Sequence, residues 1–168
     1  MIDWAALILG LVTAQRLGEL VLARRNTRRL LAQGGYEVGA AHYPLIVALH
    51  AFWLVGLWYL AVYRALAGQD IDLLWLAAFV VLQLGRLWVI VSLRGRWTTR
   101  IIVLRGAPLV RRGPYRFLSH PNYWVVAGEL LVLPLVFGLA WYGLAFTLLN
   151  AVVMWIRIRT EAAALEPQ

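Results

Sequence analysis

The sequence contains no cysteine and no lysine, and only 14% of its 168 residues are charged. Without cysteine the chain has no disulfide bonds, thiolate nucleophiles or cysteine-based metal sites. The three histidines lie far apart, without the spacing of metal ligands, so we expect no metal: His42, His50 and His120. Soluble domains carry roughly 25% charged residues, whereas this chain is 62% hydrophobic. The composition therefore predicts a membrane protein.

The charge that is present is strongly basic, with 16 basic residues against 8 acidic ones and a pI near 10.8. In a soluble protein this balance would suggest nucleic acid as a partner. In a membrane protein it is explained by arginines on the cytoplasmic side and by anionic lipid head groups. We therefore expect membrane lipids, and no nucleic acid, as partners. Arginine without lysine is typical of a GC-rich bacterial genome, which favours the bacterial inner membrane.

Five apolar stretches approach the roughly 20 residues needed to cross a bilayer. They cover about 2–23, 43–63, 71–93, 122–137 and 139–158. Only Gly138 and its neighbours separate the last two, which predicts a tight hairpin. We predict an all-α integral membrane protein with five transmembrane helices, a C-terminal helical hairpin and one domain over residues 1–168.

Arginines predict the orientation of these spans. Four follow the first span, seven lie in the loop after the third, and two end the fifth, whereas Arg64 alone lies in an opposing link. Because arginine-rich loops face the cytoplasm, we expect an external N-terminus and a cytoplasmic C-terminus. The loop after the third span and the end of the fifth then share one side. This places the predicted catalytic region, about residues 94–166, at the cytoplasm.

Polar residues inside the spans are the next candidates, because ionisable groups at membrane depth are costly and usually functional. Arg16 and Glu19 lie three apart, which predicts an ion pair. Arg86 must face protein or a wet cavity, and Glu129 must be hydrogen-bonded or protonated. Together with Asn150, Arg86 and Glu129 are the predicted substrate-binding residues.

The segment Arg111–Tyr123, RRGPYRFLSHPNY, is polar and lies between two apolar runs. Pro114 and Pro121 fix their own φ and bias the preceding residue away from the helical region, which predicts a shaped loop. A helix then begins near Pro121, so His120 and Tyr123 are held at its mouth. An ordinary interfacial loop, with arginines against head groups, is the alternative interpretation.

Two spaced motifs carry a family resemblance. The pattern G-x-Y-x-x-x-R-H-P-x-Y is met by Gly113, Tyr115, His120, Pro121 and Tyr123, and the later R-x-x-x-E-E by Arg157 and Glu161. In these motifs the chain resembles the isoprenylcysteine carboxyl methyltransferases and their bacterial relatives. Its RRNTRR and HYP segments make it most similar to the bacterial subgroup that includes alkylpyrone O-methyltransferases.

The resemblance implies that S-adenosylmethionine binds at the cytoplasmic hairpin and leaves as S-adenosylhomocysteine, while a lipophilic acceptor enters from the bilayer. It implies a cofactor pocket lined by the motif residues Gly113, Tyr115, His120, Pro121, Tyr123 and Glu161. Two residues depart from the family pattern. Ser119 stands where an arginine is usual, and Ala162 replaces the second acidic residue.

For an enol or phenol acceptor, we expect Arg159 or Arg157 to hold the oxyanion and His120 to accept its proton. A carboxylate acceptor would need the arginine and no base, and the sequence does not decide between them. A phospholipid N-methyltransferase, with an acidic group such as Glu129 in its pocket, is an alternative. So is a membrane scaffold without a cofactor. The oligomeric state stays open.

Overall fold

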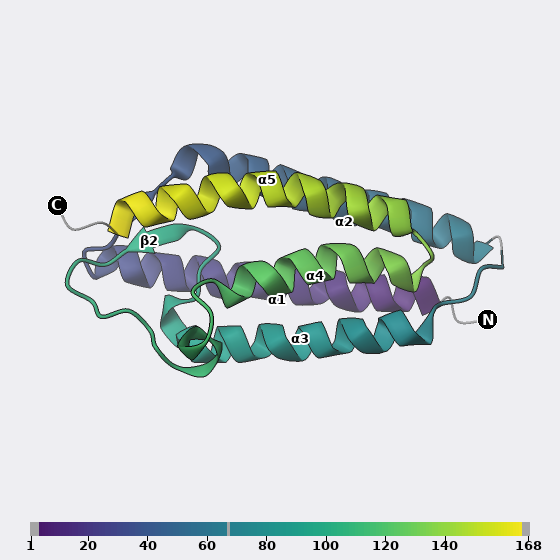
Figure 1. Ribbon diagram of the computed structural model, residues 1–168, viewed down its shortest axis with the longest axis horizontal. Helices are drawn as coiled ribbons and strands as arrows, with labels where there is room; N and C mark the ends of the chain where they lie inside the picture. Colours follow the sequence, from purple (N-terminus) through teal and green to yellow (C-terminus); the bar gives the residue numbers. More distant parts are fainter. Residues whose placement is uncertain (1–3, 67, 166–168) are drawn as a thin grey trace.

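Five helices lying side by side form the body of the computed structural model (Figure 1). The structure describes residues 4–66 and 68–165. Side chains are described for residues 4–65 and 68–159. The helices are α1 Trp4–Ala32, α2 Tyr43–Leu66, α3 Leu73–Leu93, α4 Pro121–Val136 and α5 Ala140–Leu165. The predicted C-terminal hairpin is the α4–α5 pair, joined by a turn in which Gly138 has a φ of 67°. The helix content and the apolar helices confirm the prediction of a largely helical membrane protein.

Four of the described helices are long and apolar enough to cross a membrane, by length and composition. The remaining helix, α4, is apolar but has only 16 residues, fewer than the roughly 20 that span a bilayer core. All five predicted spans therefore correspond to helices, but the count of five membrane crossings stays a prediction.

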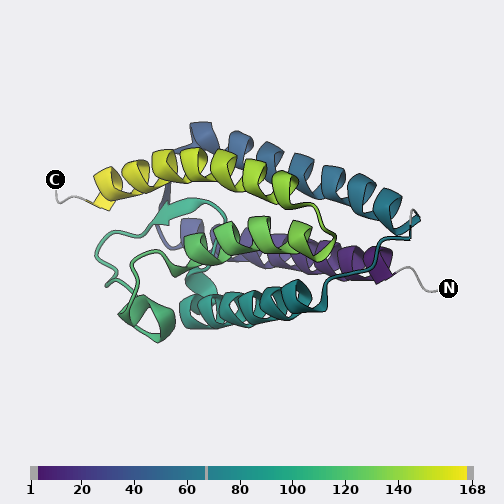
Figure 2. The same cartoon turned by 45° about the vertical axis from the view of Figure 1, so that its right-hand side comes forward.

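The helices alternate in direction, and this brings the two basic connections to the same end of the bundle. The link between α1 and α2 and the long loop between α3 and α4 both lie at the end where α5 stops (Figures 1 and 2). The short α2–α3 and α4–α5 connections lie at the opposite end. The loop that carries the sequence motif and the arginine-bearing end of α5 are therefore neighbours.

A short antiparallel ribbon, which the sequence did not predict, ties these two connections together. Strand β1 Tyr36–Val38 pairs with β2 Ile101–Val103, with Glu37 opposite Ile102. Beside it, the Arg100 guanidinium lies 2.8 Å from the Glu37 carboxylate. A hydrogen bond to this carboxylate raises the pKa of Arg100 above its ordinary value. The ribbon fixes the middle of the long loop above the helix ends.

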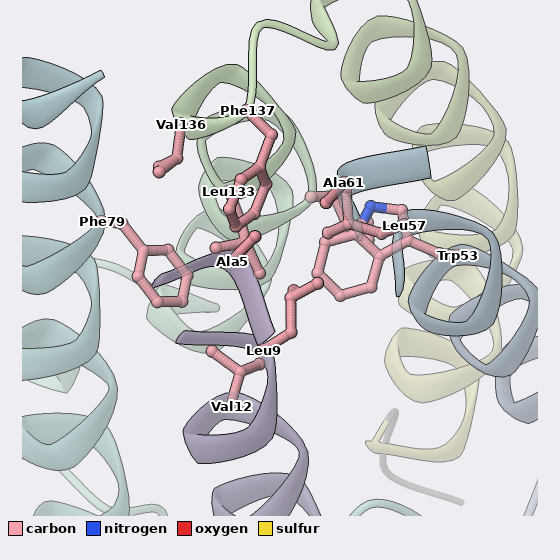
Figure 3. Packing of buried hydrophobic residues seen from close by; sticks show 11 residues of the cluster. Ala5, Leu9, Val12, Trp53, Leu57, Ala61, Phe79, Leu133, Val136 and Phe137 are labelled. Carbon is pink, nitrogen blue, oxygen red and sulfur yellow. The ribbon is translucent and has the colours of Figure 1, made fainter. Parts of the chain in front are cut away.

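The apolar core lies at the end of the bundle away from the loop. Buried side chains from the first four helices meet there, including Leu9, Leu57, Phe79 and Leu133 (Figure 3). A second, smaller cluster lies beneath the loop and contains Ala23, Val89 and Trp97. Between these two apolar regions, the bundle interior is polar.

The orientation can be tested with single cysteines, because the natural chain has none. We expect Gln69→Cys, in the α2–α3 link, to react with a membrane-impermeant maleimide in intact cells. Arg105→Cys, in the long loop, should react only after the membrane is permeabilised. Both positions are exposed, so the protein itself hides neither. Labelling of both from the same side would contradict the arrangement in Figure 1.

Candidate functional site

The loop that carries the motif is anchored on the last turn of α3. Arg112 Nε donates a 2.6 Å hydrogen bond to the Ser92 carbonyl. The next residue, Gly113, has a φ of 57°, and a Cβ there would collide with the Ser92 side chain. Glycine is therefore required both by the backbone conformation and by the close approach. A 3-10 turn, Gly113–Arg116, follows and packs Tyr115 against the cluster around Trp97.

The start of α4 presents an imidazole and a phenol as a parallel pair. His120 precedes the helix, and Pro121 is its first residue, where a missing N–H costs nothing. The His120 and Tyr123 rings stack with centroids 5.1 Å apart and planes 9° apart. The Tyr123 backbone N–H also donates to the His120 carbonyl at 3.1 Å. Both rings are thus held where the loop meets the helix.

Arg157 of α5 joins this pair to the loop. Its Nε donates to Tyr123 Oη at 2.9 Å, and its Nη1 donates to the Thr99 carbonyl at 2.9 Å. The residue is only 9% exposed, so the cation is held inside the protein. Arg157 therefore brings together α5, the start of α4 and the loop before β2.

A cavity of about 520 Å³ opens among these groups. Its volume lies within the roughly 300–1,000 Å³ of small-molecule sites. Asn122 also lines it, and the Oδ1 of this residue is buried without a hydrogen-bond partner in the described part of the chain. A buried acceptor without a partner is costly, so a ligand N–H or O–H would be stabilised there. We call this space the motif cavity; its other charged lining residues are Arg96, Arg100 and Arg111.

The motif cavity gathers part of the predicted site. Tyr115, His120, Tyr123 and Arg157 line it. Pro121 is buried at the start of α4. Gly113 belongs to the loop and packs against Ser92 of α3. These two shape the site from outside its lining.

One predicted residue near the end of α5, Arg159, stands apart from the motif cavity. Arg159 is exposed, and its guanidinium lies 4.2 Å from the centroid of the Trp155 ring. Arg159 is absent from the cavity lining. The Glu161 side chain falls outside the described residues, so its predicted contact with the cofactor stays a prediction.

The predicted substrate-binding residues Arg86 and Glu129 belong to a buried ionic network instead. Arg86 binds both carboxylate oxygens of Glu19, at 2.7 and 2.6 Å, and one oxygen of Glu129 at 2.9 Å. Arg16 lies 2.9 Å from each of the same two carboxylates. The network thus contains two cations and two anions and joins α1, α3 and α4.

Two glutamines complete the network. Gln83 donates to Glu129 at 2.8 Å, and Gln15 donates to Gln83 at 2.8 Å and to Glu19 at 3.0 Å. Charges taken out of water are tolerated when they are balanced and hydrogen-bonded on several sides. The predicted Arg16–Glu19 pair and the predicted partner for Glu129 are both present. The network is closed, so a substrate role for Arg86 or Glu129 stays a prediction.

Asn150, the third predicted substrate-binding residue, is buried in α5, two turns before Arg157. Its Oδ1 has no hydrogen-bond partner within residues 4–66 and 68–165. Asn150 therefore lies on the helix that carries Arg157, and its side-chain oxygen could accept a hydrogen bond. Its role in binding stays a prediction.

Three contributors to these sites were missed from the sequence. Asn122 stands inside the His-Pro-Asn-Tyr motif and could have been selected for that reason. Gln15 lies four residues before Glu19, at a spacing that places both on one helical face. Thr99 acts through its backbone carbonyl, and no side-chain pattern could have indicated it.

Comparison with known proteins gives the chain a family context. The sequence model of the isoprenylcysteine carboxyl methyltransferase family matches residues 75–167. An uncharacterized protein of Bacillus subtilis, YpbQ, is 34% identical over 163 residues, or 95% of each chain. An uncharacterized protein of Haemophilus influenzae is 23% identical over 159 residues, covering 92% of this chain and 90% of its own. No solved structure matches the chain.

The buried ionic network predicts an unusual stability pattern. We expect Arg86→Met to lower the free energy of unfolding by about 3–5 kcal/mol, because Glu19 and Glu129 would share Arg16 alone. The double variant Arg86→Met, Glu129→Met removes one charge of each sign and leaves the Arg16–Glu19 pair. It should lose less stability than the single variant. Denaturation in detergent micelles measures both, and a single variant as stable as the natural protein would contradict the buried network.

Proposed function

The chain belongs to the isoprenylcysteine carboxyl methyltransferase family, and we propose that it is an S-adenosylmethionine-dependent O-methyltransferase acting on a lipophilic acceptor. The observation that carries this proposal is the motif cavity, in which Tyr115, His120, Tyr123 and Arg157 surround one space at the end of the bundle. The family motif residues thus converge there from two separate segments of the chain, the loop with the start of α4 and the end of α5.

The cavity fits this cofactor in size and in chemistry. The Tyr115 ring can attract a sulfonium cation through its face. The Tyr123 ring, in contrast, already stacks on His120 and has the Arg157 guanidinium 5.7 Å from its centroid. Arg157 can hold the cofactor carboxylate, and the partnerless Asn122 Oδ1 can accept a hydrogen bond from an amino or hydroxyl group. The cofactor would supply an electrophilic methyl group at this place.

The missing family arginine at Ser119 has several possible replacements nearby. Ser119 lines the cavity, as do Arg96, Arg100 and Arg111. Arg100 is paired with Glu37, so we propose Arg96 or Arg111 as the cation that stands in for an arginine before the histidine. We therefore propose that the departure at Ser119 changes which arginine faces the cofactor and leaves the cofactor class unchanged.

The protein residues then have positioning as their main task, because a displacement at a methyl group needs little covalent help. Arg157 holds Tyr123, and the stack with Tyr123 holds the His120 ring. His120 can accept the proton of an enol or phenol, whereas a carboxylate acceptor would need no base. An acidic enol or phenol of the alkylpyrone type and a prenylcysteine carboxylate are the two acceptor classes that fit.

Exposed apolar side chains close to His120 in the sequence support a lipophilic acceptor. Phe117 and Trp124 are 75% and 70% exposed, and the exposed Leu118 lines the cavity. They lie on either side of His120 in the sequence. An acceptor with a hydrocarbon tail would bury these surfaces while its polar head reaches His120.

The lining of the motif cavity and the buried ionic network both argue against a phospholipid N-methyltransferase. Methylation of an amine favours a carboxylate beside the nitrogen, but no aspartate or glutamate with a described side chain lines the motif cavity. Glu129 is 3% exposed and is paired with both Arg16 and Arg86. It is therefore not free to serve an amine.

Cofactor binding can be tested on the purified protein by calorimetry with S-adenosylhomocysteine. We expect His120→Ala and Tyr123→Phe to weaken binding about tenfold or more, because the second variant removes the acceptor of the Arg157 Nε–H bond. The control is Trp124→Phe, at an exposed aromatic position next to Tyr123. Natural affinity in all three variants, or no binding by the natural protein, would contradict the enzyme proposal.

The acceptor side can be tested by incubating membranes with labelled S-adenosylmethionine and following the lipid fraction. We propose that Arg159, exposed two residues beyond Arg157, leaves the Trp155 ring to hold the acceptor oxyanion. Arg159→Ala should then slow labelling about 100-fold, the cost of one oxyanion donor, with unchanged S-adenosylhomocysteine affinity. Trp155→Leu, which only frees the guanidinium, should keep the rate. Full labelling by Arg159→Ala would contradict this role.

A further inference from the structure

A second cavity, of about 620 Å³, lies beside the motif cavity where α1 and α3 end. We call it the arginine cavity. Its lining includes five arginines and no aspartate or glutamate: Arg29, Arg94, Arg96, Arg111 and Arg112. Five like charges around one hollow repel one another unless an anion or solvent screens them. The composition of the lining therefore suits an anionic ligand.

The guanidinium groups of this cavity are largely uncommitted. Arg96 and Arg112 each donate one hydrogen bond to a backbone carbonyl, of Pro108 and Ser92. Within the part of the chain that the structure describes, none of the five forms an ion pair. This contrasts with Arg100 nearby, which pairs with Glu37. Arginines that served only to link loops would each be paired with a carboxylate, as Arg100 is.

The backbone at Arg94 adds an independent observation. Its φ is 51°, and it is the only described residue other than glycine with a positive φ. Glycine adopts this conformation without strain, whereas an arginine does so at a cost. The strained residue caps α3 and is among the residues that line the cavity. A side chain that carries a cation is thus present where glycine would fold more easily.

Apolar groups share the lining with the arginines. Leu93, Leu104 and Leu109 contribute, and Leu109 is 68% exposed. The cavity also lies at the ends of two helices that are long and apolar enough to cross a membrane. A ligand there meets cations on one side and hydrocarbon on the other, as at a membrane surface.

We propose that the arginine cavity binds the phosphate group of an anionic membrane phospholipid. Guanidinium groups are suited to this ligand because their paired N–H donors match two phosphate oxygens at once. The leucines would contact the glycerol and the first methylene groups. The arginine cavity shares Arg96 and Arg111 with the motif cavity, whereas Arg29, Arg94 and Arg112 line the arginine cavity alone.

The test compares lipids on the purified protein in an uncharged detergent, with binding followed by native mass spectrometry. We expect phosphatidylglycerol to bind at least tenfold more tightly than phosphatidylcholine. Arg29→Gln and Arg94→Gly should each weaken phosphatidylglycerol binding about tenfold, as expected for a lost hydrogen bond between charged groups. Arg28→Gln is the matched control, because Arg28 is exposed on the same helix but does not line the cavity.

Loss of fold cannot imitate this result. Arg94→Gly replaces a strained residue by the one that suits its φ, so its thermal stability without lipid should equal or exceed that of the natural protein. If Arg94→Gly is nevertheless less stable, Arg29→Gln decides, since Arg29 is exposed and lies in a regular helix. The affinity of Arg29→Gln for S-adenosylhomocysteine should be natural, which separates this site from the motif cavity.

Three results would overturn the proposal. Equal losses in Arg28→Gln and Arg29→Gln would mean that diffuse surface charge attracts the lipid. Equal affinity for phosphatidylglycerol and phosphatidylcholine would remove the anionic lipid as the ligand. Displacement of phosphatidylglycerol by an equal concentration of glycerol 3-phosphate would mean that a soluble phosphate compound is the natural occupant.

Discussion

The buried ionic network is the constraint on which the arrangement of the helices depends. Four charges in the interior of a membrane bundle are stable only while each anion keeps its cations. Because Arg86 on α3 holds Glu19 on α1 and Glu129 on α4, the three helices are fixed in rotation and in depth. An apolar interface alone would let one helix slide past another more easily.

This constraint reaches the candidate active site through α4. Glu129 lies about two turns after Pro121 on the same helix, so the network sets where His120 and Tyr123 stand. A second tie comes from α5, where Arg157 holds the Tyr123 hydroxyl. The site is thus built at one end of a helix that is held from two directions. Rigid support of this kind is what positioning catalysis requires.

The sequence predicted what depends on local pattern and left undetermined what depends on long-range contacts. Apolar runs located the helices, and the three-residue spacing found the Arg16–Glu19 pair. The network partners Arg86 and Glu129 lie 43 residues apart, and no periodicity connects them. The β1–β2 ribbon was missed because strands of three residues leave too little alternation to detect.

The two arginines near the end of α5 show the same difference between what local pattern predicts and what long-range contacts decide. Arg157 and Arg159 are two positions apart, which puts them on different faces of a helix, and the structure has one buried at the motif cavity and the other exposed over Trp155. Helical geometry was sufficient for that difference. It was not sufficient to identify Tyr123 and Thr99 as the partners of Arg157, since these contacts arise only when the loop folds back over the bundle.

The shortness of α4 has a consequence for where the chemistry takes place. Sixteen helical residues rise about 24 Å, less than the roughly 30 Å of a hydrocarbon core. If α4 is a fifth span and its far end reaches the opposite surface at the tight turn to α5, its His120 end falls short of the near surface. In the proposed methyltransferase, the groups around His120 would then lie in a recess below the head groups. A lipid would present its methyl-accepting atom there without being lifted into water, whereas the water-soluble cofactor would descend to meet it.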